Sequence, residues 1–159
     1  DAEECETHLN GLYVARGSAH IDNHTLVDHA KPNCFSNELF KGIVTDSATG
    51  VFNGKVLVRQ DAQKTNAYQS SKSIVLDRSA QIYAKPELEI YADDVKCSHG
   101  ATTGELDEEA LFYLRSRGIP EKAARLMLLE AFARDVVDLV DNEAVKQYLY
   151  ERLHHLLSS

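Results

Sequence analysis

The pattern of the chain changes near Gly104, and this change constrains the fold more than any other feature of the sequence. Residues 1–104 hold seven of the eight glycines and show no helical period. Short apolar runs recur there between turn dipeptides such as Asn53-Gly54. They predict seven strands, over residues 9–14, 24–29, 38–44, 51–58, 72–76, 88–92 and 94–99. No strict repeat is visible, so the pattern fits a sandwich, a barrel and a stacked β-solenoid equally well.

Residues 105–159 carry helical signals instead, which predicts a β core over residues 1–104 and a helical domain over 105–159. Asp107 is a favourable N-cap, and Gly118 is typical of a helix stop. Pro120 is expected in the first turn of a second helix, where its missing N–H costs nothing. Asn142, with the neighbouring aspartate, predicts the start of a third helix.

The second helix is unusual because residues 123–140 are apolar over most of its circumference. A surface helix needs an apolar stripe of only about 100°. We therefore expect this helix at the centre of a small bundle or beneath a partner. Three helices in so short a segment make a thin core, so the helices are expected to lean on the β part or on another protein.

Charge and composition exclude several classes of protein. The chain has 17 Lys and Arg against 25 Asp and Glu, a net charge of −8. General nucleic-acid binding requires a basic face, so we expect no nucleic-acid partner. No run approaches the 18 or more apolar residues of a membrane span, so no membrane association is expected. Four tyrosines are accordingly expected to pack rather than to stack on bases: Tyr83, Tyr91, Tyr148 and Tyr150.

Three cysteines, Cys5, Cys34 and Cys97, are widely separated and odd in number. A disulfide framework uses an even and dense set, so a reducing compartment, the cytoplasm, is the better interpretation. Each thiol is expected to be free and to behave as a small buried hydrophobe.

Three histidines, His20, His24 and His29, lie close together in the sequence. On a helix, the spacing of His20 and His24 would suggest a metal site. The β-branched, alternating context favours a strand instead, with His20 and His24 on one face and His29 on the other. Hydrogen-bonded histidines are therefore favoured over a metal centre.

The densest polar cluster spans residues 93–104 and contains Cys97 and His99. In an extended chain these two side chains project from the same face. They suit a soft metal or a Cys/His nucleophile pair, but the residues alone favour a structural turn. A cysteine hydrolase also needs an oxyanion hole and an orienting group, and neither is visible in the sequence.

The same segment carries a resemblance to a known family. The run K-C-S-H-G-A-T-T-G (96–104), with the following L-D-E-E-A-L-F-Y-L-R-S-R-G-I (106–119), resembles the SufB/SufD family of iron–sulfur cluster assembly proteins. The upstream runs D-N-H-T-L-V-D-H (22–29) and F-K-G-I (40–43), with Pro32, Cys34 and Ser36 between them, resemble it too. The resemblance covers about residues 8–140.

Within that family the chain is more similar to the SufD branch than to the SufB branch. SufB-like chains read E-H-E-A-T-T where this chain has S-H-G-A-T-T, and F-Y-C where it has F-Y-L. A cysteine of a Q-C-D-S stretch in SufB-like chains corresponds to Q-S-S-K (69–72) here, with no thiol. The resemblance thus implies a chain that does not act alone as the cluster scaffold.

The resemblance implies a right-handed parallel β-helix followed by a small C-terminal helical domain, which selects the solenoid from the three β folds. Family members are longer, so the chain is expected to be the C-terminal portion of a longer protein. The resemblance further implies a non-catalytic subunit that pairs with a SufB-like paralogue through the β-helix ends. It also implies a SufC-like ABC ATPase bound to the C-terminal helices.

The site implied by the resemblance lies at the partner interface. His99 matches the family position proposed to ligate an iron–sulfur cluster there, and Cys97 is a weaker candidate. We expect any cluster to be shared with a partner subunit and none to be held by the chain alone. We also expect a homodimer through the open β-helix end. The alternatives are a self-associating structural β-solenoid and, less favoured, a Cys/His hydrolase.

Overall fold

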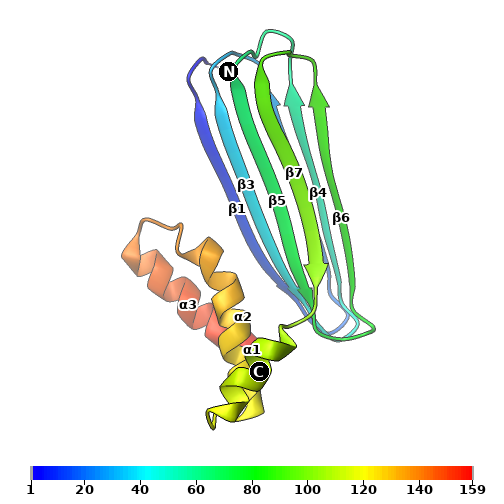
Figure 1. Cartoon of the computed structure of the whole chain (residues 1–159), viewed down its shortest axis with the longest axis vertical. Coiled ribbons are helices and arrows are strands. Elements are labelled where there is room, and N and C mark those ends of the chain that lie inside the picture. Colours follow the sequence, from blue (N-terminus) through cyan, green and yellow to red (C-terminus); the bar gives the residue numbers. More distant parts are fainter. Residues whose placement is uncertain (1, 159) are drawn as a thin grey trace.

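A computed structural model describes residues 2–158 as a parallel β-solenoid of about three turns followed by three helices (Figure 1). The strands are β1 (Glu6–Ala15), β2 (His20–His29), β3 (Phe35–Val44), β4 (Thr49–Val58), β5 (Thr65–Val75), β6 (Gln81–Ile90) and β7 (Val95–Gly104). The helices are α1 (Glu108–Ser116), α2 (Glu121–Val137) and α3 (Glu143–Ser158). The predicted fold class is confirmed.

Each coil of the solenoid gives one strand to each of two parallel sheets. Sheet A has the order β1-β3-β5-β7, and sheet B has the order β2-β4-β6 (Figure 1). Every strand pairs in parallel with the strand one coil away, over ten residue pairs. Inward and outward side chains therefore stack in register from coil to coil.

The corners of the coils contain a repeat that the residue types hide. Glu4, Asn33 and Lys64 each have a positive φ, between 58° and 60°, and each stands two residues before an in-register position of sheet A. The backbone N–H of each corner residue donates to the next coil, as from Asn33 to Gln63 O at 2.9 Å. Three different residue types at equivalent corners explain why no strict repeat is visible in the sequence.

The interior combines bulky side chains with glycines opposite them. Phe40 and Phe52 pack with ring centroids 4.7 Å apart. A Cβ placed on Gly11 would lie 2.3 Å from the Phe40 ring, and one on Gly42 would lie 2.4 Å from the Tyr13 ring. These glycines stand inside strands because an aromatic side chain occupies the space where their own would be.

All seven predicted strands exist, and each is longer than predicted. The predicted residues 76, 91–92 and 94 lie outside β5, β6 and β7. The helices begin and end as follows. Asp107 caps α1 by accepting from the Ala110 N–H at 3.0 Å, and Gly118 has the left-handed φ of 86°. Pro120 is the residue before α2 rather than part of its first turn, and α2 ends at Val137, short of the predicted residue 140. Asn142 caps α3 through the Val145 N–H.

The helices pack against the solenoid, as predicted from the small core that three short helices can form. Helix α2 is central among the helices, and it contacts α1, α3 and the strands β1 and β3. Ile43, on the outer face of β3, joins Leu106 and Leu129 in one buried cluster. Helix α2 therefore covers the outer face of sheet A near the ends of β1 and β3. No helix within residues 2–158 is long and apolar enough to cross a membrane.

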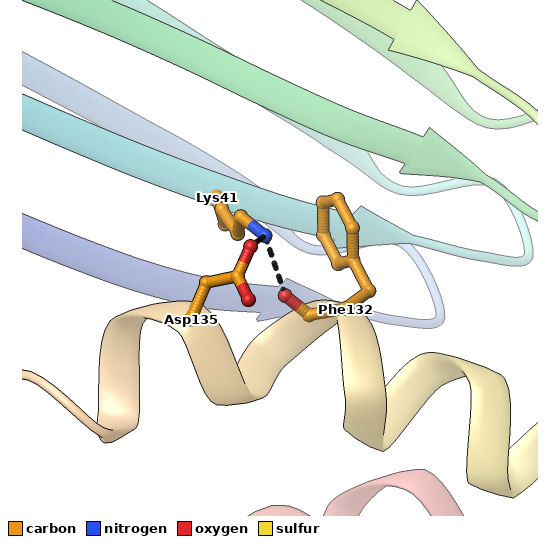
Figure 2. A network of polar contacts seen from close by, with 3 residues as sticks. All are labelled: Lys41, Phe132 and Asp135. Carbon is orange, nitrogen blue, oxygen red and sulfur yellow. Dashed lines mark hydrogen bonds and ion pairs between the residues drawn. The ribbon is translucent and has the colours of Figure 1, made fainter.

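A buried lysine joins α2 to β3. Lys41 lies on the outer face of β3, and its Nζ donates to the Phe132 carbonyl oxygen at 2.7 Å and pairs with Asp135 (Figure 2). The Nζ atom also lies 4.3 Å from the centroid of the Phe132 ring, which favours a cation–π contact. One side chain of the solenoid thus makes three contacts with one turn of α2.

Candidate functional site: the open edge of the last strand

The polar cluster predicted as a turn is the last strand of the solenoid. Residues 95–104 pair with β5 along their whole length. The predicted strand over 94–99 is therefore confirmed from Val95 onward and continues to Gly104, and the structural-turn interpretation of the cluster is wrong. Gly100 and Gly104 both lie within this strand. Cys97 pairs with Ala67, and His99 pairs with Gln69. Both partners are buried and face inward, so Cys97 and His99 share the inward face of β7, as predicted.

His99 is more exposed than Cys97 because β7 lies at the end of the solenoid. Within residues 2–158, sheet A has four strands and sheet B three, so no sheet-B strand lies beyond β6 to cover the far side of β7. His99 is exposed, as is the rest of β7 from residue 98 to 104. Cys97 is half-buried against the core cluster that contains Val56 and Ala67.

Burial makes Cys97 a weaker nucleophile and a weaker metal ligand than an exposed thiol. Burial raises the pKa of the Cys97 thiol above its ordinary value, and a backbone hydrogen bond at Ala67 offsets this only in part. The thiolate, not the thiol, attacks carbonyls and binds metals. His99 is therefore the better candidate of the two for binding a metal at this edge.

Two polar side chains stand behind His99 inside the solenoid, and the sequence interpretation missed both as site residues. Glu38, Gln69 and His99 occupy the same inward position on β3, β5 and β7. Gln69 Nε2 donates to Glu38 Oε2 at 2.6 Å, and the two residues are 3% and 1% exposed. Their other oxygens, Gln69 Oε1 and Glu38 Oε1, have no hydrogen-bond partner among the described residues.

The edges of the two sheets at this end differ in chemistry. The edge strand β6 carries Lys85, Pro86, Glu87 and Glu89. Charges and proline are the usual means by which proteins keep an exposed edge from pairing. From residue 98 to 104, β7 has no Asp, Glu, Lys, Arg or Pro and is exposed throughout. The β7 edge is therefore chemically suited to pair with another strand, and the β6 edge is not.

The other predicted histidines lie away from this edge. His20 and His24 face outward on β2, and His29 faces inward, as predicted. His24 Nε2 lies 2.9 Å from Asp22 Oδ1, and His29 Nε2 lies 2.8 Å from Ser36 Oγ. Across residues 2–158, no group of three or more His, Cys, Asp or Glu side chains could hold a metal ion. An iron–sulfur cluster has about four protein ligands, more than the residues described at β7 provide.

The tyrosine prediction is wrong for three of the four residues. Tyr83, Tyr91 and Tyr148 are 58%, 59% and 60% exposed, so they do not pack in a core. Tyr83 lies on the outward face of sheet B, which nothing in the described chain covers. The three cysteines are free, as predicted, but only Cys34 is buried, whereas Cys5 and Cys97 are half-buried.

Apolar side chains are also exposed on the helices. Phe112 and Tyr113 on α1 are 73% and 56% exposed, and Met127 on α2 is 47% exposed. Exposed apolar surface of this kind marks a candidate contact surface for another protein.

Comparison with known proteins identifies the family. Residues 1–132 match the family model described as "SUF system FeS cluster assembly, SufBD core domain". The chain is 40% identical over 153 residues to the iron–sulfur cluster assembly protein SufD of Escherichia coli K12, covering 96% of this chain and 36% of that protein. It is 44% identical over 138 residues to an iron–sulfur cluster assembly SufBD family protein of Synechocystis, covering 87% and 30%.

A plant relative is similar over the same region. Protein ABCI7, chloroplastic, of Arabidopsis thaliana is 36% identical over 152 residues, covering 95% of this chain and 32% of that protein. The chain thus spans about a third of the length of these curated relatives. It belongs to the SufBD family of iron–sulfur cluster assembly proteins, and within that family it is most similar to the C-terminal part of SufD.

Proposed function

We propose that this chain is a non-catalytic, SufD-like subunit of a SufBCD-type assembly complex, working in the cytoplasm. The observation that carries the proposal is the exposed, uncharged edge of β7 at the end of the solenoid. The similarity to the SufD of E. coli supports the role in iron–sulfur cluster assembly. The raised pKa of the Cys97 thiol argues against the alternative of a Cys/His hydrolase.

The β7 edge is the proposed contact with a SufB-like paralogue. An unpaired strand edge binds an extended strand of a partner through main-chain hydrogen bonds. Gly100 faces outward on β7, and a Cβ added there would meet no atom within 4 Å. The small side chains along this edge allow a second backbone to approach closely.

His99 is the proposed point of contact with the cluster, which is the product being assembled and is shared with the paralogue. Its imidazole is exposed at the edge where the paralogue would pair. Neutral imidazole ligates iron in some mixed His/Cys clusters. Cys97 remains the weaker second ligand, and we propose that the chain alone holds no cluster.

The helices are the proposed contact with a SufC-like ABC ATPase. The exposed Phe112 and Tyr113 offer that partner an apolar anchor on α1. Helix α2 lies between α1 and the solenoid strands β1 and β3, so a displacement of the helices reaches sheet A directly. The subunit would in this way transmit ATP-driven motion to the β7 edge.

The proposal is tested by co-purifying the full-length protein with its SufB-like and SufC-like partners. Gly100→Lys puts a charge beside the β7 edge and should abolish binding of the paralogue; Asn53→Lys, on the outer face of the central strand β4, is the control. His99→Ala should leave the complex intact and lower its iron and sulfide content. Phe112→Ser should release only the ATPase, with Tyr83→Ser as its control.

Two outcomes would contradict the proposal. If wild-type protein binds neither partner, the SufD-like role is wrong. If it instead forms a homodimer that Gly100→Lys dissociates, the chain is a self-associating solenoid.

A further inference from the structure

The polar row behind His99 requires an explanation, because a solenoid interior is normally apolar. Burying an amide or carboxyl oxygen without a hydrogen bond destabilises a folded protein. Glu38 Oε1 and Gln69 Oε1 are both buried, and neither has a partner among the described residues. Gln69 is the neighbour of His99 in the ladder, one coil inward.

The Gln69 amide has a fixed orientation. Gln69 Nε2 donates to Glu38 Oε2, 2.6 Å away, which directs the amide nitrogen toward the carboxyl group. The acceptor, Oε1, is then the group of Gln69 that remains for another partner. His99 is the inward-facing side chain next to Gln69 on β7, and its imidazole can donate an N–H.

Sheet B leaves room for this arrangement. A Cβ on Gly54 would lie 2.5 Å from Gln69 Nε2 and 2.9 Å from Thr25 Oγ1. A larger residue at position 54 would force a shift of the Gln69 amide or of its neighbours. The glycine in the middle of β4 therefore holds open the space that the Gln69 side chain fills.

We propose that Gln69 is a positioning residue for His99, held in place by Glu38; the inference rests on the proposed function of the β7 edge. Gln69 Oε1 accepts the N–H of one imidazole nitrogen when a partner covers the end of the solenoid. The other ring nitrogen is then unprotonated and directed to the interface with the paralogue, where it ligates iron. Histidine ligands of metals commonly donate their second N–H to an oxygen in this way.

The test uses the full-length protein, labelled with ring ¹⁵N-histidine, in complex with its unlabelled SufB-like paralogue. Solid-state ¹⁵N spectra report which nitrogen of each imidazole carries the proton, and the His99→Ala difference spectrum assigns the His99 signals. Wild type should show a single neutral tautomer for His99. Gln69→Leu should show both tautomers, with complex formation unchanged and cluster retention reduced about tenfold or more.

Two variants of Glu38 separate positioning from simple packing. Glu38→Gln still offers an acceptor to Gln69 Nε2, so it should keep the wild-type tautomer. Glu38→Leu lets the amide turn, so it should behave as Gln69→Leu does. Gln69→Met replaces Gln69→Leu should the latter fail to fold, and its spectrum is interpreted in the same way.

Different results would contradict the positioning role of Gln69 and the proposed function. A single His99 tautomer and full cluster retention in Gln69→Leu or Gln69→Met overturn the positioning role of Gln69, while the proposed function stands. Full cluster retention in His99→Ala overturns the site itself.

Discussion

The Lys41 ammonium and the Asp135 carboxylate form an unequal pair, because the lysine side chain is 3% exposed and the aspartate side chain is 60% exposed. The cation therefore depends on its protein partners, whereas water can solvate the anion. Figure 2 shows the lysine head group against one turn of α2, beside the Asp135 carboxylate and the Phe132 carbonyl oxygen.

This inequality predicts that the two halves of the pair respond differently to mutation. Asp135→Ala leaves a buried ammonium with the Phe132 carbonyl as its remaining polar partner, and should cost about 2–3 kcal/mol of unfolding free energy. Lys41→Met keeps the aliphatic volume and leaves an exposed carboxylate, and should cost about 1 kcal/mol or less. Urea unfolding followed by circular dichroism measures both. Equal losses of unfolding free energy in the two variants would show that burial of the Lys41 ammonium does not determine the cost of breaking the pair.

Stability should fall as the pH drops through the neutral-to-acid range because of His29. Burial lowers the pKa of His29 below its ordinary value of 6.5, and the nearby Asp28 carboxylate only partly opposes this. Below about pH 6.5 the unfolded chain takes up a proton on this imidazole that the folded chain does not, so acid favours unfolding.

The histidine prediction is checked with thermal unfolding between pH 5.5 and 8. His29→Gln retains a polar group for Ser36 and should flatten the dependence on pH. His20→Gln, at an exposed outward position of the same strand, should leave the slope unchanged. An unaltered slope in His29→Gln would assign the pH dependence to other groups.

Cys5 and Cys34 should form a disulfide under mild oxidation. They are neighbours on successive coils, where the Phe35 N–H donates to Cys5 O at 2.8 Å. Both thiols lie against the Ala2 carbonyl oxygen, at 3.3 and 3.4 Å. Adjacent strands are about 4.8 Å apart, within the Cα separation that a disulfide tolerates.

Diamide, which accepts the two thiol hydrogens, followed by peptide mass spectrometry tests this pairing. We expect a Cys5–Cys34 link and an unlinked Cys97. Cys34→Ser should leave Cys5 without a link within the molecule. A disulfide that involves Cys97 would contradict the register of the coils.

Substitutions of two glycines should differ in their effect on stability. Gly54→Ala forces a Cβ against Gln69 and Phe52, at 2.5 and 2.6 Å, and should cost about 1–3 kcal/mol. Gly100→Ala meets open space on β7 and should be neutral or slightly stabilising. Denaturant midpoints of the two variants provide the comparison. A neutral Gly54→Ala would mean that the interior around Gln69 can relax.

The positions of the strands and helices were predictable because they depend on local signals. Alternation identified the strands, and Asp107, Gly118 and Asn142 marked helix ends through their own side chains or backbone preferences. The stacking of the strands was not predictable from their pattern, because equivalent corners use glutamate, asparagine and lysine. The choice of a solenoid therefore depended on family resemblance.

The site was predictable only along one strand. Alternation placed Cys97 and His99 on one face, since that relation needs only two residues of extended chain. Glu38 and Gln69 are 31 residues apart, and their contact depends on a coil-to-coil register that no local signal carries. The exposure of Tyr83 was missed for a similar reason: alternation shows that a face exists but not whether anything covers it.

The unequal strand count of the two sheets has a consequence for how proteins of this architecture can vary. Each coil pairs only with its neighbouring coils, so coils added before β1 leave the strand pairing around β7 unchanged. A strand that paired with the β7 edge would contact only this end of the solenoid. Overall length can drift during evolution, therefore, while the terminal half-coil behaves as a fixed connector.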